Sequence, residues 1–340
     1  MLKDLSIAQY TLMANKKITI LNVDIDDLTQ EQILERLGKG GLLMTTNVDH
    51  LMILQKNPDF YRAYQLADYR VCDSKIIMYA SNFLGTPITE KLSGSDLFPA
   101  FCQYYKNDED IKIFLLGAAE GIADKAKNNI NQKIGRSIIV DSFSPSMDFE
   151  TSLQECKEAI QAINQSEANV LAIGLGAPKQ EKWIAMYARQ LKKIKTIFLI
   201  GATIDFEAGT KKRAPKWMSE IGLEWFYRLF SEPKRLWKRY LVESLPFFWL
   251  IGKQKLGLYK CPFEQSNYNH YTVPLGQILL QKELISPRDL EVALQKLNKD
   301  NHKAEIGEIL LEMGLINHDQ FEQALNEQKK RMIFFKDELS

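Results

Sequence analysis

The chain has 340 residues, 45% hydrophobic and 26% charged, a mix that is typical of globular proteins and excludes a disordered, collagenous or low-complexity chain. Its 44 basic and 43 acidic residues almost cancel, so the overall charge does not indicate nucleic-acid binding, and we expect none. Cys72, Cys102, Cys156 and Cys261 show neither a CxxC pair nor a regular spacing. This argues against a disulfide framework or a zinc site and is typical of the reducing cytosol.

Segments that direct a chain to or through a membrane are not evident. Residues 1–17 mix charged and polar side chains with apolar ones, so we expect no secretion signal. The longest apolar runs, 170–176, 196–202 and 245–252, are far shorter than the roughly 20 residues that cross a bilayer. We therefore expect a protein that is either soluble or peripheral on a membrane.

Short apolar runs alternate with helical patterns over the first 200 residues. The expected strands cover residues 41–45, 69–72, 112–116, 138–140, 170–173 and 196–200. The expected helices run from His50 through Leu66 and over 121–134, 152–164 and 178–191. This order predicts an α/β, Rossmann-like domain over residues 1–210, with a mostly parallel sheet and helices on both faces. Ligands of such sheets bind beyond the carboxyl ends of the strands.

Polar side chains follow the first two strands of this predicted sheet. Thr45 and Asn47 could hydrogen-bond a sugar or phosphate, although turn chemistry and helix capping explain them somewhat better. Asp73 follows the second strand as a lone carboxylate. It is a candidate general base, with a helix N-cap as the alternative.

Glycine-rich turns supply further candidates for anion binding. Gly94 and Ser95 begin an expected helix whose backbone N–H groups can hold an anion, and Lys91 precedes them. Asp96, in the same turn, is explained equally well as a partner of the helix dipole. The turns at 117–121 and 174–181 resemble those that bind nucleotides in Rossmann sheets, but neither is GxGxxG.

Two acidic stretches, 24–26 and 108–110, have the Asp-any-Asp spacing that holds a divalent cation in many sugar-nucleotide enzymes. A helix start and a polar turn explain them better, so we expect no metal site.

Positive charge is concentrated in residues 211–260, which hold twelve basic and four acidic residues and four of the five tryptophans. We expect a basic, aromatic helical appendage over 211–262. Three interpretations stay open: a core helix pair with a solvated basic face, a segment that binds an anionic membrane, and a phosphate-binding surface.

The chain ends in an internal repeat behind a polar linker at 263–271. Residues 275–280, 284–290 and 293–294 recur 31 positions later as 306–311, 315–321 and 324–325. Each unit predicts a short helix, a turn and a second helix capped at Ser286 or Asn317. We expect a small all-α module over 272–332.

Several blocks together resemble the WecG/TagA/CpsF glycosyltransferases over roughly residues 15–255. The most specific is Gly-Leu-Gly-Ala-Pro-Lys-Gln-Glu at 174–181, and the others follow in the family's order and spacing: 45–47, 57–58, 67–68, 73, 94–97, 201–209, 213–215 and 222–240. The resemblance implies an inverting transfer, without metal or cofactor, of a sugar such as N-acetylmannosamine. The donor would be a UDP-sugar and the acceptor a polyprenyl-diphosphate-linked glycan, in cell-surface or exopolysaccharide synthesis.

The resemblance also assigns roles to individual residues. Asp73 matches the proposed general base, and Lys91 stands where an arginine is usual. Thr45, Asn47 and Gln180 match pocket residues of the family. The full set of residues expected to bind substrate adds Gly94, Ser95, Gly117, Gly174, Gly176 and Asp205, together with Arg228, Arg235 and Arg239. The last three would clamp the diphosphate and reach an anionic membrane surface. Ser74 and Ile76 replace glycines that are usual in the family, so a weakly active sugar-nucleotide binder is the alternative.

The C-terminal repeat resembles the N-terminal domain of type II secretion and pilus-assembly ATPases, some of which bind cyclic di-GMP. The arginine that begins each repeat there is replaced by Pro274 and Glu305, which removes the natural partners of nucleotide phosphates. We therefore expect a protein partner ahead of cyclic di-GMP. A regulatory scaffold that acts through this module is a second alternative function.

Overall fold

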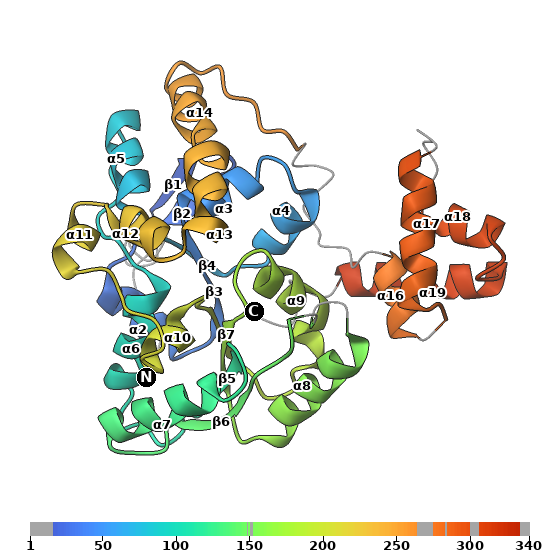
Figure 1. Cartoon of the computed structure of the whole chain (residues 1–340), viewed down its shortest axis with the longest axis horizontal. Helices are drawn as coiled ribbons and strands as arrows, with labels where there is room; N and C mark the ends of the chain where they lie inside the picture. The colour runs from blue at the N-terminus through green and yellow to red at the C-terminus, as the bar shows by residue number, and fades with distance from the viewer. Residues whose placement is uncertain are drawn as a thin grey trace, which may run out of the picture.

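A parallel sheet forms the centre of the computed structural model, which describes residues 16–147, 149, 152–263, 275–282, 284–299 and 306–333 (Figure 1). Its strands are β3 (Gly41–Thr46), β4 (Tyr69–Cys72), β5 (Ile113–Gly117), β6 (Ile139–Phe143), β7 (Val170–Gly174) and β8 (Thr196–Leu199). They lie in the order β4-β3-β8-β7-β5-β6, and every neighbouring pair is parallel. The predicted α/β class and parallel sheet are confirmed.

Helices cover both faces of the sheet because alternate residues of its buried strands point to opposite sides. Leu42 and Met44 of β3 belong to one hydrophobic cluster, whereas Leu43 belongs to the other. The first cluster is covered by α3 (Val48–Ile53), α4 (Pro58–Tyr64), α5 (Lys75–Leu84), α8 (Leu153–Gln165), α9 (Lys179–Tyr187) and α14 (Pro246–Lys255). The second is covered by α2 (Gln30–Leu37), α6 (Gly94–Tyr104), α7 (Ile122–Ile134) and α10 (Thr203–Glu207).

Two local features differ from the sequence-based expectations. An antiparallel hairpin of β1 (Lys17–Ile20) and β2 (Val23–Asp26) precedes the sheet, where the sequence analysis expected only the start of a helix. The helix expected from His50 through Leu66 is broken into α3 and α4. Asn57 caps α4 through a bond from the Phe60 N–H, and Pro58, which has no N–H, begins the new helix.

The basic segment after the sheet forms short helices that lie above the carboxyl ends of the strands (Figure 1). They are α11 (Lys216–Glu220), α12 (Glu224–Ser231), α13 (Pro233–Lys238), a π-helical turn η2 (Arg239–Glu243) and α14. Helix α14 anchors the segment because Phe247 and Ile251 are buried in the first cluster. A 3-10 turn, η1 (Ala188–Gln190), follows α9.

The C-terminal repeat forms α16 (Leu275–Gln281), α17 (Pro287–Lys299), α18 (Ile306–Glu312) and α19 (His318–Ile333), which keep the offset of 31 residues. The predicted caps are confirmed: Ser286 Oγ accepts from the Asp289 N–H at 3.2 Å, and Asn317 Oδ1 accepts from the Gln320 N–H at 2.8 Å. The module's buried leucines and isoleucines form one cluster with Ala63 of α4 and Ala185 of α9. Most of the expected linker, from residue 264 on, lies outside the described residues.

Candidate active site

A cavity of about 680 Å³ opens beyond the carboxyl ends of β3, β4, β7 and β8 and is covered from the other side by α11 to η2. The predicted site residues that line it are Thr45, Asn47, Asp73, Lys91, Gly94, Ser95, Gly176, Gln180, Arg228 and Arg239. These residues come from segments far apart in the sequence. The parallel sheet brings them together because its strands all end at the same edge.

Asp73 is placed by the register of β3 and β4. Cys72 pairs with Thr46, and the next N–H, that of Asp73, donates to the Thr46 carbonyl oxygen at 2.8 Å. The helix-cap alternative is wrong for Asp73, because Ser74 occupies the N-cap of α5 and no side-chain hydrogen bond caps that helix. Burial, together with the neighbouring Glu224 carboxylate, holds the pKa of Asp73 well above its usual value, while Lys91 and Arg228 act in the opposite direction. A carboxylate with these properties in a cleft suits a general base.

A polar network that the sequence analysis did not predict joins the β4 end to the appendage. Lys91 Nζ donates to Ser219 Oγ at 2.8 Å and lies 3.7 Å from Glu224 Oε2. Ser219 Oγ in turn donates to Glu224 Oε2 at 3.0 Å. Ser219 and Glu224 both line the cavity, and no motif in the sequence marks them as partners of Lys91.

Asn47 and Thr45 lie on the strand wall of the cavity. The capping alternative is correct for the oxygen of Asn47, since Oδ1 accepts from the His50 N–H at 2.9 Å and caps α3. The side chain also lines the cavity, so its amide nitrogen is the part left for a ligand. Thr45 is buried beside Gly94, the first residue of α6.

The start of α6 is held by its own residues and by Arg213. Ser93 Oγ caps the helix by accepting from the Asp96 N–H at 3.2 Å and donates to Asp96 Oδ2 at 2.6 Å. Arg213 forms an ion pair with Asp96 and donates to Ser95 Oγ at 3.1 Å. Asp96 is therefore mainly a structural partner, as the dipole alternative suggested.

Gln180 connects the two turns that form the floor of the cavity. Its Oε1 accepts from the Gly176 N–H at 3.2 Å and from the Gly201 N–H at 3.3 Å. These turns follow β7 and β8, which are neighbours in the sheet. Gly176 has a φ of 77°, which favours glycine at this turn.

Of the predicted residues that the structure describes in full, Gly117, Gly174 and Asp205 do not line the cavity. A Cβ added to Gly117 would lie 2.6 Å from the Gly174 carbonyl carbon, so these glycines allow two strand ends to approach closely. Asp205 lies in the first turn of α10, and its carbonyl oxygen accepts from the Thr210 N–H at 3.0 Å. A role of these three in substrate binding stays a prediction.

The predicted arginines come from the appendage. Arg228 on α12 lines the cavity and acts on Asp73 electrostatically. Arg239 on η2 forms an ion pair with Asp49 of α3, which the sequence analysis had not singled out. Arg235 lies on α13, but its side chain is outside the described part of the structure.

The appendage also exposes large apolar side chains. Those between residues 216 and 255 with more than two fifths of their surface exposed are Trp217, Ile221, Phe226, Phe230, Trp237, Leu241, Val242, Leu245, Phe248 and Trp249. The helices in the described part of the chain all lack the combination of length and apolar character that crossing a bilayer requires.

The acidic stretches considered as metal sites have structural partners. Asp24 accepts from Thr19 Oγ1 at 2.7 Å, and Asp26 accepts from the Arg70 N–H at 2.9 Å. Asp108 accepts from the Asp110 N–H at 3.0 Å within its turn. Among the described residues, no three His, Cys, Asp or Glu side chains are grouped to hold a metal ion.

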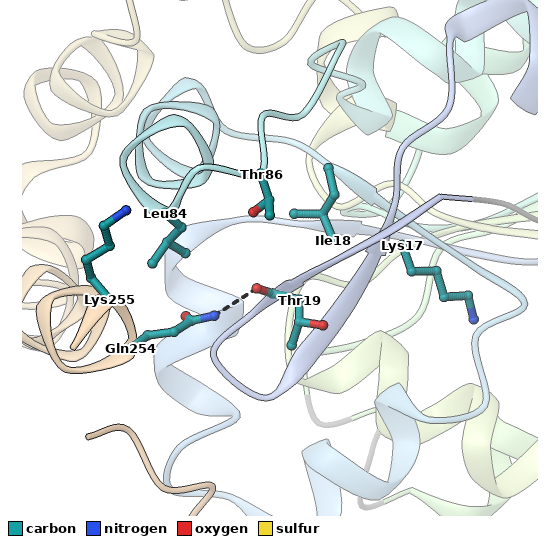
Figure 2. A pocket seen from close by; sticks show the side chains of 7 residues that line it. All are labelled: Lys17, Ile18, Thr19, Leu84, Thr86, Gln254 and Lys255. Atoms are coloured by element: carbon teal, nitrogen blue, oxygen red, sulfur yellow. Dashed lines mark hydrogen bonds between the residues drawn. The ribbon is translucent and has the colours of Figure 1, made fainter. Parts of the chain in front are cut away.

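A second hollow, of about 400 Å³, lies between β1, the end of α5 and α14 (Figure 2). The predicted site residues do not line it. Its lining includes Lys17 and Lys255, and Gln254 Nε2 crosses it to donate to the Thr19 carbonyl oxygen at 2.8 Å. That hydrogen bond joins α14 to the hairpin, which explains the hollow as a packing feature.

Comparison with known proteins shows the family to which the chain belongs. The chain is 28% identical over 250 residues to the N-acetylglucosaminyldiphosphoundecaprenol N-acetyl-beta-D-mannosaminyltransferase of Staphylococcus aureus strain MRSA252, covering 70% of this chain and 93% of that protein. The protein of the same name from strain MW2 is 28% identical over 251 residues, with the same coverage. The model of the glycosyl transferase WecG/TagA/CpsF family matches residues 18–261. The chain therefore belongs to this family and is a glycosyltransferase.

Proposed function

We propose that the chain transfers a sugar such as N-acetylmannosamine from a UDP-sugar to a polyprenyl-diphosphate-linked glycan, with inversion at the anomeric carbon. The observation that carries this proposal is the position of Asp73 in the cavity, with Lys91 and Arg228 acting on it electrostatically. The names of the Staphylococcus aureus relatives supply the sugar and the lipid-linked acceptor.

The reaction is a single displacement. Asp73 takes the proton of the acceptor hydroxyl while the oxygen attacks the anomeric carbon. The bond between that carbon and the β-phosphate oxygen breaks, and UDP leaves with the bonding electrons. The raised pKa of Asp73 suits this role, because a stronger base accepts the proton more readily once it is ionised.

Positive side chains stabilise the leaving pyrophosphate in this scheme. Lys91, Arg228 and Arg239 line the cavity. Guanidinium and ammonium groups in a partly dry cleft stabilise developing negative charge strongly. The proposal therefore assigns to these three side chains the part that a divalent cation plays in other glycosyltransferases, and activity is expected to persist in a chelator.

The acceptor brings the reaction to a membrane surface. The exposed aromatic side chains Phe230 and Trp249 lie on α12 and α14, and the exposed Lys234 lies on α13, which comes between these two helices in the chain. This combination suits binding to the interface of an anionic membrane, with apolar rings in the acyl boundary and cations at the headgroups. The proposed location is the cytoplasmic face of the plasma membrane.

Turnover measurements test the proposal. Purified protein is incubated with UDP-N-acetylmannosamine, UDP-N-acetylglucosamine or UDP-glucose, with and without polyprenyl-diphosphate N-acetylglucosamine, in buffer that contains EDTA. We expect UDP release that needs both the N-acetylmannosamine donor and the lipid-linked acceptor, and a product of inverted configuration. Activity that disappears in EDTA and returns with magnesium would contradict the metal-independent scheme.

A regulatory scaffold, or a weakly active sugar-nucleotide binder, is the second candidate function. The observation in its favour is the helical module, which lies beyond the family match at 18–261 and buries apolar residues against α4 and α9. A protein partner of this module is proposed ahead of cyclic di-GMP. Truncation after residue 262 tests the candidate: a loss of partner binding or localisation with unchanged turnover favours a scaffold role, whereas no change in any of the three rejects it.

A further inference from the structure

A buried acidic residue, Glu181, lies directly behind the floor of the cavity on α9. It is 1% exposed, and its Oε1 accepts from Gln180 Nε2 at 3.0 Å. Gln180 is itself 3% exposed and holds the N–H groups of Gly176 and Gly201 through its Oε1. A single amide therefore joins a carboxylate on one side to two backbone turns on the other.

We propose that Glu181 is a positioning residue of the transfer reaction: its carboxylate fixes the orientation of the Gln180 amide, and that amide sets the two glycine turns on which the donor rests. An amide side chain has an accepting and a donating end, and a flipped amide would present its NH₂ group to the Gly176 and Gly201 donors. A carboxylate accepts hydrogen bonds only, so Glu181 selects the orientation in which the NH₂ group faces it. One N–H of Gln180 is then left for a ligand in the cavity.

Charged groups from other elements face the same carboxylate. The pKa of Glu181 is raised to about 7, mainly by burial. The hydrogen bond from Gln180 and the charge of Arg239 act to lower this pKa, whereas the charge of Asp49 acts to raise it. Tyr64 of α4 also interacts with Glu181 electrostatically. Glu181 Oε2 and Arg239 Nε are both buried without a hydrogen-bond partner among the described residues. Glu181 therefore lies where the floor of the cavity meets the appendage.

The two atoms without partners in the described part of the chain, Glu181 Oε2 and Arg239 Nε, favour a contact between these side chains. A buried acceptor and a buried donor that lack partners are each destabilising, and the two are complementary in charge. A direct bond between them, or one bridging water, satisfies both.

Amide hydrogen exchange of the full-length chain, followed by peptide mass spectrometry, tests the proposal without relying on activity. Glu181→Met removes the acceptor and keeps a similar volume, whereas Glu181→Gln can still offer a carbonyl oxygen to Gln180. Glu158→Gln is the matched control, since it removes the same charge from the exposed face of α8. Exchange at the turns around Gly176 and Gly201 should rise about tenfold in Glu181→Met, the scale of one lost buried hydrogen bond.

Glu181→Gln should restore most of the protection, and the Glu158→Gln control should match the wild type. Wild-type protection of both turns in Glu181→Met would overturn the proposal. If Glu181→Met does not fold, Glu181→Asp replaces it, because the shortened side chain withdraws the carboxylate from Gln180. Unchanged protection in Glu181→Asp would likewise overturn it.

Kinetics give the second readout and rest on the proposed transfer reaction. The KM for the UDP-sugar should rise about tenfold in Glu181→Met, while the KM for the lipid-linked acceptor stays within about twofold. Equal changes in both would indicate a general structural defect and contradict a positioning role. If the wild type turns over no UDP-sugar, the proposed function fails, whereas the exchange measurement still decides the role of Glu181.

Discussion

The two walls of the cavity are built in different ways. The wall formed by the strand ends is buried and held by backbone register, with Thr45 at 6% and Gln180 at 3% exposure. The appendage wall, formed by α11 to η2, is different. Its elements α12 and η2 contain no buried residue, although Leu236 of α13 is only 2% exposed. The appendage wall meets the rest of the site largely through charged and polar contacts, between Lys91 and Glu224 and between Arg239 and Asp49.

This contrast indicates that the two walls have different roles in the site. Burying one large apolar side chain contributes about 1.5–3 kcal/mol, whereas the attraction within a partly buried ion pair is offset by the cost of removing both charges from water. The strand wall is therefore preformed and holds the proposed base, Asp73, while the position of the appendage wall depends on the charges around it. Substrate phosphates, salt and a membrane surface should all act mainly on the appendage.

The largest expected effect belongs to the strand wall. Asp73→Asn should lower turnover by about 10²–10⁴-fold, because it removes the general base. Its stability at neutral pH should equal or exceed that of the wild type. The folded-state pKa of Asp73 is raised, so ionising this carboxylate costs folding free energy above its unfolded pKa, and asparagine avoids that cost. Turnover assays and thermal melts measure the two effects, and near-normal turnover would remove Asp73 from its role.

The next effect tests the appendage wall. Arg228→Ala should lower turnover by about 10²-fold, since it removes one group that stabilises the leaving pyrophosphate. Lys234→Ala is the matched control, because Lys234 is an exposed cation on the next helix and does not line the cavity. Equal losses in the two variants would mean that the overall charge of the appendage matters and not the position of Arg228.

Membrane binding should involve the appendage alone. Replacement of Phe230 and Trp249 by serine should weaken binding to anionic vesicles by about tenfold, because both side chains are mostly exposed and apolar. High salt should release the wild type from the same vesicles, since exposed charges are screened. Sedimentation with anionic and neutral vesicles measures both effects, and equal binding to the two kinds would contradict the role of charge.

The smallest effect links the two walls. Glu224→Gln removes a negative charge that raises the pKa of Asp73. Asp73 must be ionised to act as a base, so turnover falls as the pH drops through its pKa. The variant should therefore move the acid limb of the pH–rate profile to lower pH. A limb that stays in place or moves to higher pH would show that Glu224 does not act on Asp73.

The sequence predicted the sheet and much of the strand wall but little of the contact between the walls. Apolar runs ending in polar residues identified all six strands of the central sheet and placed Asp73 and Asn47 at one edge. Ser219 and Asp49 were missed because their importance comes from partners far away in the sequence. Glu181 stood inside the most specific motif, yet only its burial next to Gln180 gives it a role.

The glycine turns show how one pattern can serve two purposes. The sequence grouped Gly117 and Gly174 with Gly176 as possible nucleotide contacts. In the structure Gly176 lines the cavity, whereas Gly117 and Gly174 let neighbouring strand ends pack closely. Close packing and ligand approach both favour glycine, so residue type alone does not separate them.

A crystal structure of the Asp73→Asn variant with its UDP-sugar tests the central claim most directly. The account predicts the diphosphate within about 3.2 Å of Lys91 or Arg228 nitrogens, with the anomeric carbon facing residue 73 and no metal between the phosphates. UDP bound in the hollow beside Lys17 and Lys255, or a diphosphate held by a divalent cation, would contradict it.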